Sequence, residues 1–252
     1  TAYEKFYKLI EENHKDVICE KRIIQSDVAN AKPFKTEILL LKKTYIYKRF
    51  IKRFIDIVLS LVGLVVLAIP MLVFALIVKL DSPGPVLFWQ KRVGIHKKTF
   101  MMPKFRTMYT DTPANMPTHL LSDPQKWITR SGAWFRKLSI DELPQILCIF
   151  TGKMSIIGPR PALWNQDDLI EERDKYGAND VRPGLTGWAQ INGRDELEIP
   201  VKARLDGEYV QNLSFLFDCR CFFGTIFKVL RHDGVVEGGT GTLHEEKEPA
   251  LK

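Results

Sequence analysis

The stretch that decides how this chain is organised is Ile57–Val78, IVLSLVGLVVLAIPMLVFALIV, which contains no charged residue. About 20 consecutive apolar residues cross the hydrocarbon core of a bilayer, so this run is long enough to form a membrane helix. A buried core helix of this length and evenness would be unusual. We therefore expect residues 51–80 to contact a membrane.

The charges around this run bear on its topology. Basic residues cluster on both sides of it, at Lys42, Lys43, Lys48, Arg49, Lys52 and Arg53 before and Lys79, Lys91, Arg92, Lys97, Lys98, Lys104 and Arg106 after. Positive charge tends to stay on the cytoplasmic side, and a simple span would place one cluster on the wrong side. Pro70 lies in the middle of the run, where it removes a helical hydrogen bond and bends the helix.

These observations favour a re-entrant helix-break-helix over residues 51–80 that enters one leaflet and returns. We expect Asp56, near the entry, to pair with Arg53 across one helical turn. An ordinary tilted span with a proline kink is the alternative that the sequence leaves open.

The rest of the chain divides around this segment. We expect residues 1–50 to form an N-terminal helical extension, residues 81–234 the catalytic domain and residues 235–252 a flexible tail. Within the extension, residues 3–28 carry apolar side chains at helical intervals. The stretches DSPGPVLFWQ (81–90) and TFMMPKFRTM (99–108) predict two strands of a hairpin. Helices are expected around 139–150, 162–176 and 213–231.

The predicted fold class is therefore α+β, a re-entrant membrane helix plus a mostly helical cytosolic catalytic domain with a small β-hairpin. The formal net charge is +7, which points to an anionic partner. Nucleic acid, an acidic membrane surface and phosphorylated substrates all fit that sign. We expect no nucleic-acid partner, because the sequence carries a membrane run and no recognisable nucleic-acid module.

Adjacent carboxylates, Asp141 and Glu142, lie in RKLSIDELPQ (136–145) close to Arg136 and Lys137. Ser139 with Glu142 three residues later is also a capping-box signature, which would give both side chains a purely structural role. A carboxylate at a helix N-terminus between cations would be ionised, as a carboxylate nucleophile at phosphorus must be. The two interpretations are compatible, because a cap can hold a nucleophile in place.

Three further segments are candidates for a functional site. In GKMSIIGPRPA (152–162), Gly158, Pro159 and Pro161 would hold the backbone around Arg160 rigid, and arginine binds phosphate through two parallel hydrogen bonds. A tight loop with a purely structural role is the alternative. In KFRTM (104–108), strand alternation would place Lys104 and Arg106 on one face, as a solvated edge or as the wall of an anion site. VRPGLTGWAQINGRD (181–195), which includes Arg182, reads as an ordered functional loop or as a rigid loop packed on the core.

Together these motifs resemble the bacterial sugar transferase family, the monotopic phosphoglycosyl transferases that start lipid-linked glycan assembly. The resemblance runs from about Lys52 to about Leu230 and rests on motifs in the family's order: KRFID, DSPGPVLFWQKRVG, KFRTM, TRSGAWFRKLSIDELPQ, GKMSIIGPRP, VRPGLTGWAQINGR and LDGEYVQNLSFLFD. The family usually has asparagine where this chain has Cys148.

The resemblance implies that Asp141 attacks the β-phosphorus of a UDP-sugar, releases UMP and holds the phospho-sugar as an acyl phosphate. Polyprenyl phosphate would then accept the phospho-sugar. The resemblance also implies Mg²⁺ at the diphosphate, with Asp141 and Glu142 as its protein contacts. The predicted phosphate-binding set is Lys104, Arg106, Arg136, Gly158, Pro159, Arg160, Pro161, Arg182 and Asp206.

The same resemblance predicts a monotopic enzyme on the cytoplasmic face of the bacterial inner membrane, in contact with phospholipid. A homodimer formed through the N-terminal extension is a further expectation. Two rival functions stay open from the sequence. One is a glycosyltransferase that moves only the sugar and releases UDP; the other is a catalytically inactive membrane scaffold for a glycan assembly complex.

Overall fold

The computed structural model describes residues 46–112, 124–193 and 197–231, all within a compact unit that begins at Ile46. The expected helix at 3–28 and the tail from residue 235 lie outside these described residues. Where described, the chain is mostly helical with a small antiparallel hairpin, which confirms the predicted α+β class.

The apolar run forms one long helix. A π-helical turn, η3 (Tyr47–Ile51), leads directly into α4 (Lys52–Asp81). This is the one helix in the described ranges that is long and apolar enough to cross a membrane, and only 6% of its most apolar stretch is buried against the protein. Water would solvate such a surface poorly, whereas lipid covers it without cost. The helix therefore indicates that the protein associates with a membrane.

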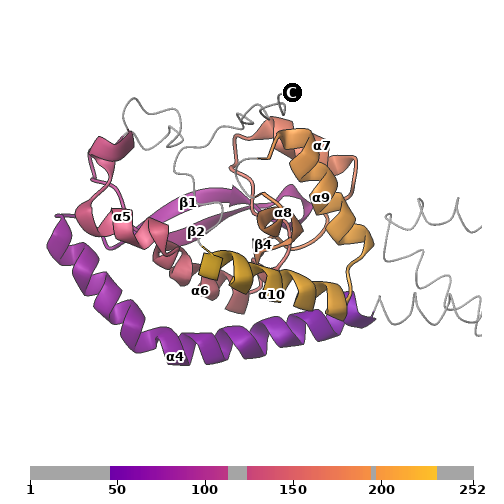
Figure 1. Cartoon of the computed structure of the whole chain (residues 1–252), viewed down its shortest axis with the longest axis horizontal. Coiled ribbons are helices and arrows are strands. Elements are labelled where there is room, and N and C mark those ends of the chain that lie inside the picture. The colour runs from indigo at the N-terminus through magenta and orange to yellow at the C-terminus, as the bar shows by residue number, and fades with distance from the viewer. Residues whose placement is uncertain (1–45, 113–123, 194–196, 232–252) are drawn as a thin grey trace, which may run out of the picture. The chain divides into compact units, whose positions relative to one another are not determined.

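Pro70 bends α4 without ending it. The helix is continuous from Lys52 to Asp81, and its ribbon changes direction midway (Figure 1). The expected helix-break-helix is thus a bent helix in this structure, because a proline removes one hydrogen bond and a helix of this length keeps the rest.

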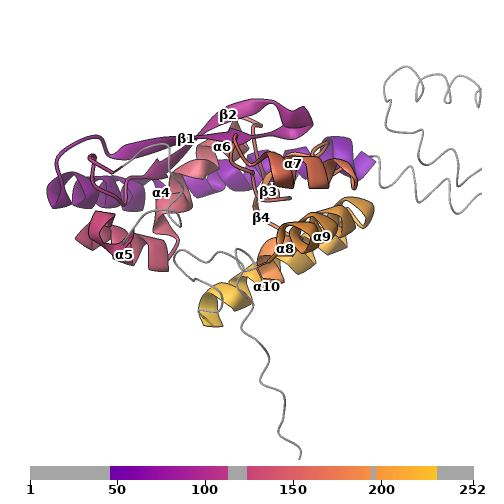
Figure 2. The same ribbon diagram turned by 90° about the horizontal axis from the view of Figure 1, so that it is seen from above.

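The hairpin is confirmed at nearly the expected positions. Strands β1 (Leu87–Val93) and β2 (Thr99–Phe105) pair antiparallel, with Leu87 opposite Phe105 and Val93 opposite Thr99. A short 3₁₀ turn, η4 (Ile95–Lys97), connects them. Figure 2 shows the two strands on one side of the body, and Phe105 at the end of β2 belongs to the same apolar cluster as Val78 near the end of α4.

A second pair of strands was not predicted. Strands β3 (Ser155–Ile157) and β4 (Gly184–Thr186) pair in parallel, and three residues are too few to show a period in the sequence. The remaining helices are η6 (Pro124–Trp127), α5 (Arg130–Lys137), η7 (Ile140–Gln145), α6 (Ile146–Phe150), α7 (Asp167–Asp174), α8 (Trp188–Ile191), α9 (Ile199–Gln211) and α10 (Phe215–Arg231). The helix expected at 139–150 is divided into η7 and α6, with Pro144 in the 3₁₀ part.

Polar contacts hold the N-terminal end of α4 to the body. Arg53 donates to the carbonyls of Ile149 and Phe150 at the end of α6, at 2.6 and 2.7 Å. Asp56 is 3% exposed and accepts from Ser155 Oγ and Ile156 N at 3.0 and 2.9 Å. The expected Arg53–Asp56 pair is therefore not the contact that forms, because each side chain finds a partner on the body instead.

The C-terminal end of α4 is held to the same body. Val78 is buried among Phe105 and Phe135. The Asp81 carboxylate accepts from the backbone N–H and hydroxyl of Ser131, at 2.9 and 2.7 Å, in the first turn of α5. Arg106 donates to the carbonyl of Ser82 at 2.7 Å, just past the helix. Both ends of α4 are thus fixed to one body.

Replacing Asp56 with alanine leaves the donors of Ser155 and Ile156 without their acceptor in a buried site. An unsatisfied buried donor costs about 1–3 kcal/mol, so we expect thermal unfolding in detergent to show a loss of that order. Asp56→Asn keeps an acceptor oxygen and should lose less. Asp111→Ala, on an exposed side chain, is the control. Equal unfolding temperatures for Asp56→Ala and the control would show that this contact does not hold α4.

Candidate functional site

The paired carboxylates lie in the 3₁₀ turn η7, packed against β2. Ser139, which precedes the turn, has a left-handed backbone conformation with φ 54°, and its side chain does not cap the helix. Only the backbone contributes there, through Glu142 N donating to the carbonyl of Ser139 at 3.3 Å. The capping-box interpretation is therefore wrong, and the Glu142 side chain is directed to other partners.

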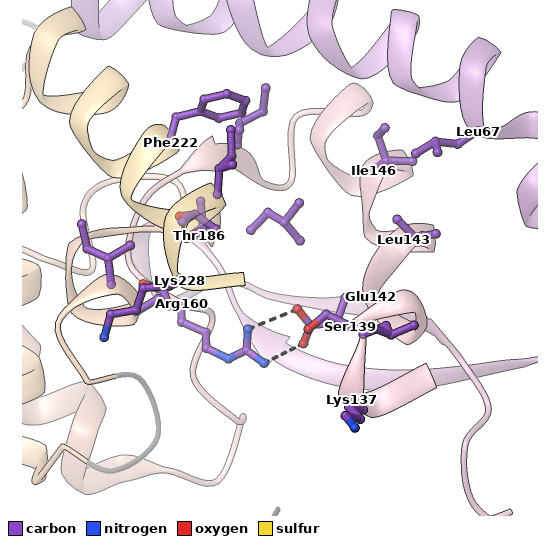
Figure 3. Close-up of a pocket in the computed structure, with 17 residues that line it drawn as sticks. Leu67, Lys137, Ser139, Glu142, Leu143, Ile146, Arg160, Thr186, Phe222 and Lys228 are labelled. Carbon is purple, nitrogen blue, oxygen red and sulfur yellow. Dashed lines mark hydrogen bonds and ion pairs between the residues drawn. The ribbon is translucent and has the colours of Figure 1, made fainter. Parts of the chain in front are cut away.

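Those partners are two cations from different parts of the chain. Lys104 Nζ, from β2, donates to Glu142 Oε1 at 2.9 Å. Arg160 donates to the same oxygen at 2.7 Å and reaches Oε2 at 3.4 Å, as Figure 3 shows. Burial alone would raise the pKa of Glu142, but the charges and hydrogen bonds of Arg160 and Lys104 outweigh it and hold the pKa well below its usual range. Glu142 is therefore a fixed anion.

Asp141 has a different environment. Burial raises its pKa above the ordinary value, against the lowering effect of Lys104, and the like charge of Glu142 raises it further. Lys104 Nζ lies 3.9 Å from Asp141 Oδ2, beyond hydrogen-bond distance. Arg136, which donates to Thr107 Oγ1 at 3.0 Å, lies near enough to lower the pKa of Asp141 through its charge. Among the residues described, cations thus hydrogen-bond to the Glu142 carboxylate, whereas they act on the neighbouring Asp141 only through their charge.

The loop Gly158–Pro161 aims Arg160 at this pair. Gly158 N donates to the carbonyl of Thr186 and Gly184 N to that of Pro159, each at 2.8 Å, so the loop extends the β3–β4 pairing. A Cβ on Gly158 would lie 2.5 Å from the carbonyl oxygen of Arg182, so only glycine fits there. The carbonyl of Pro161 accepts from Arg92 at 2.9 Å on the other side. The predicted rigidity of this loop therefore comes from backbone pairing as well as from its prolines.

Three predicted site residues have their side chains engaged elsewhere. Arg106 is buried and donates to the carbonyls of Ser82 and Pro83, so its guanidinium closes the end of α4. Arg182 donates to the carbonyl of Gly152 at 3.2 Å. Asp206 is fully buried in α9, where one of its oxygens accepts from Arg173 at 2.8 and 2.6 Å. The structure brings together Lys104, Arg136, Asp141, Glu142 and Arg160, and leaves these three outside that cluster.

The carboxylate pair was also expected to contact Mg²⁺. Among the described residues, no group of three or more His, Cys, Asp or Glu side chains is arranged to hold a metal ion. Mg²⁺ is usually held by one or two carboxylates together with substrate phosphates and water, which a pair of adjacent carboxylates can satisfy. Glu142 Oε1 already has two cationic partners, so Asp141 is the carboxylate more available to an ion. The pair fits Mg²⁺ that arrives with a phosphorylated substrate.

A cavity of about 350 Å³ opens beside Glu142 and Arg160 (Figure 3). Its walls include residues that were not predicted to belong to the site, among them Gln190, Phe222, Ile226 and Lys228. Phe222 and Ile226 are one helical turn apart in α10, and this spacing in the sequence could have indicated that they share one face of the helix. The amide of Gln190 had no such signal, because its position depends on the β4–α8 turn.

The chain matches the family model described as bacterial sugar transferase over residues 47–232. It is 39% identical over 185 residues to "Uncharacterized sugar transferase EpsL" of Bacillus subtilis, covering 73% of this chain and 90% of that protein. It is 41% identical over 194 residues to "Exopolysaccharide production protein PSS" of Rhizobium leguminosarum bv. phaseoli, covering 71% and 95%.

A third relative is the Escherichia coli protein named "UDP-glucose:undecaprenyl-phosphate glucose-1-phosphate transferase". The identity is 39% over 188 residues, or 71% of this chain and 40% of that protein. The chain thus spans nearly all of the two shorter relatives and less than half of this longer one.

The Glu142 cluster makes a prediction about stability and pH. Because its folded pKa lies below the unfolded value of about 4.3, the ionised carboxylate stabilises the fold above that pH, and the stabilisation is lost as pH falls through the folded pKa. Glu142→Gln should therefore lower the unfolding temperature at pH 7, and the difference from wild type should shrink below about pH 4.3.

Glu172→Gln removes a surface pair with Lys175 and serves as the control, since such pairs contribute about 0–1 kcal/mol. The Glu142 variant also removes the like charge beside Asp141, so the measured difference is a net effect. A difference that is constant from pH 3 to pH 7 would contradict the account of Glu142 as a fixed anion.

Proposed function

The chain belongs to the bacterial sugar transferase family, and we propose that it transfers a sugar-1-phosphate from a UDP-sugar to polyprenyl phosphate. The products would be UMP and a polyprenyl diphosphate-sugar, in the first membrane step of capsule, exopolysaccharide or O-antigen assembly. The observation that carries the proposal is the unequal carboxylate pair. Glu142 is held by two cations, whereas Asp141, beside it, has no cation within hydrogen-bond distance among the residues that the structure describes.

Asp141 is the proposed nucleophile. Its carboxylate oxygen forms a bond to the β-phosphorus of the donor, and the bond from that phosphorus to the bridging oxygen breaks, so the electron pair leaves with UMP. An oxygen of polyprenyl phosphate then attacks the same phosphorus and displaces the carboxylate. Dividing the transfer into two steps means that the donor and the acceptor need not be bound together.

The cations supply the electrostatic part of the mechanism. Lys104 and Arg160 are positioned before any substrate arrives, because Glu142 binds both of them. Preorganised cations stabilise charge that develops on phosphoryl oxygens and need no rearrangement during the reaction. Glu142 is thus proposed to hold these cations beside the β-phosphate.

Mg²⁺ would neutralise the donor diphosphate when bound, with Asp141 and Glu142 as the protein contacts. The remaining binding comes from the side chains already in place. Arg136 precedes Asp141 in the chain. Its positive charge favours the ionised form of Asp141 that the attack requires.

We propose a monotopic topology on the cytoplasmic face of the bacterial inner membrane. A straight helix of 30 residues is about 45 Å long, more than the roughly 30 Å hydrocarbon core. Both ends of α4 nevertheless contact one body, through Asp56 at one end and Asp81 at the other. A span would put these ends on opposite sides of the bilayer. A bent helix entering one leaflet keeps both contacts and leaves the apolar surface in lipid.

Topology can be tested with single cysteines at Lys48 and Pro85, exposed positions just outside the two ends of α4. We expect a membrane-impermeant thiol reagent to label neither position in intact spheroplasts and both after the membrane is opened. The unsubstituted protein gives the background from its native cysteines. Labelling of one position from outside would refute the one-leaflet topology.

The released nucleotide tests the chemistry. Purified enzyme in detergent is given a panel of UDP-sugars, Mg²⁺ and polyprenyl phosphate. We expect UMP from at least one donor, and we expect Asp141→Asn to abolish turnover by removing the anionic oxygen while leaving folding and membrane association intact. Asp167→Asn, on an exposed position of α7, is the matched control and should retain activity.

Other outcomes favour the rival functions. Release of UDP would identify a glycosyltransferase that moves only the sugar. No nucleotide release from any donor would favour the inactive membrane scaffold. Full activity of Asp141→Asn would exclude Asp141 as the nucleophile.

A further inference from the structure

The cavity beside Glu142 has walls from both the catalytic site and the membrane helix. Its volume is about 350 Å³, within the range of small-molecule sites. The apolar part of the wall includes residues from distant parts of the chain, among them Leu67 of α4, Ile146 of α6 and, from α10, Phe222 and Ile226. The cavity therefore lies between the apolar membrane helix and the carboxylate cluster.

Polarity changes along this cavity. At the end nearest α4, Leu67 and Ile146 lie on one side and Phe222 on the other, whereas the Glu142–Arg160 pair lies farther from α4 with Lys137 beyond it (Figure 3). A ligand that matches this order has an apolar chain toward the membrane and an anionic head toward Arg160. A nucleotide-sugar matches it poorly, because leucine, isoleucine and phenylalanine offer no partners for hydroxyl groups or for a base.

A buried amide indicates that the cavity takes a ligand with polar atoms. Gln190 lines the wall, and both its Oε1 and its Nε2 are buried without a hydrogen-bond partner in the described structure. The neighbouring hydroxyls of Thr186 and Thr225 are already bonded to each other at 2.7 Å. A buried amide without a partner is unfavourable, so an occupant that offers it a hydrogen bond binds more tightly.

The wall formed by α10 is fixed relative to the membrane helix. Asp218, in the first turn of α10, accepts from Tyr47 at 2.5 Å, Lys52 at 2.6 Å and Tyr209 at 2.8 Å. Asp218 is 7% exposed, and these three donors tie α10 to the start of α4 and to α9. Phe222, one turn later, is therefore held over the cavity whether or not a ligand is present.

From these observations we propose that the cavity binds the isoprene units next to the phosphate of the polyprenyl phosphate acceptor. Phe222 and Ile226 contact the chain from one side and Leu67 and Ile146 from the other, while Arg160 faces the phosphate. This inference rests on the proposed function, whose acceptor it places. Because the cavity is small, it encloses the first units only and the remaining chain lies in lipid along α4. Recognition therefore depends on the first units and not on the total chain length.

The first test separates acceptor binding from donor chemistry in the full-length protein. Phe222→Ala removes one wall of the cavity, so we expect the KM for polyprenyl phosphate to rise about tenfold or more, a loss of about 1.4 kcal/mol. The first half-reaction, measured as exchange of labelled UMP with the UDP-sugar in the absence of acceptor, should be unchanged. Phe227→Ala, on a more exposed side chain of the same helix outside the cavity, is the matched control and should leave both rates unchanged.

Two results would overturn the proposal. One is an unchanged acceptor KM in Phe222→Ala. The other is an equal loss of both half-reactions, which would mean that Phe222 has only a structural role.

A binding experiment does not depend on turnover. A polyprenyl monophosphate with a diazirine on its second isoprene unit is cross-linked to the membrane-embedded protein, and the labelled peptides are mapped. We expect label on residues 143–146 and 222–226. Label confined to other segments, or equal labelling of these residues by a diazirine on a fatty acyl chain of phosphatidic acid, would overturn the proposal. If the proposed transfer were itself wrong, wild type would release no UMP, and the cross-link would still report the occupant of the cavity.

Discussion

The rest of the structure depends on the attachment of both ends of one apolar helix to the same catalytic body. At one end, Asp56 accepts hydrogen bonds from β3. At the other end, Asp81 accepts them from the first turn of α5, and Arg106 closes the helix end. These are polar contacts to charged side chains, and hydrogen bonds of this kind are stronger than those between neutral groups. With the ends fixed, the bend at Pro70 lets the apolar surface face away from the body, where only lipid can cover it.

This attachment determines where the carboxylate cluster lies relative to the membrane helix. Strand β2 carries Lys104 and ends at Phe105, which packs with Val78 of α4. Turn η7 packs against β2 and carries Asp141 and Glu142. The loop after β3, which Asp56 anchors, carries Arg160. Each residue of the carboxylate cluster thus lies on, or packs against, an element that contacts α4. A reaction between a water-soluble donor and a lipid acceptor needs such a site, because its two substrates occupy different phases.

The sequence predicted the elements whose signals are local. The uncharged run at 57–78 predicted the membrane helix, and the stretches at 81–90 and 99–108 predicted the hairpin. Lys104, Glu142 and Arg160 were assigned to one site from motifs and from the family resemblance. The residues around Arg160 in the sequence do not indicate which carboxylate it binds.

Contacts between distant segments were beyond prediction. The family resemblance implied that Arg106 binds phosphate, but its guanidinium donates to the carbonyls of Ser82 and Pro83, just past the end of α4. Arg53 and Asp56 are one turn apart, yet each has a better partner on α6 or β3. Asp206 was expected in the active site, and its buried pair with Arg173 depends on the packing of α7 against α9. The unsatisfied amide of Gln190 becomes visible only once the cavity is formed.

The measurement that tests the account most directly is the mass of the intact protein after incubation with its donor and Mg²⁺ and without acceptor. The account predicts an added mass equal to the phospho-sugar, located on the peptide that contains Asp141 and removed when polyprenyl phosphate is added. An unmodified protein that nevertheless turns over donor and acceptor together, or an adduct on another residue, would contradict it.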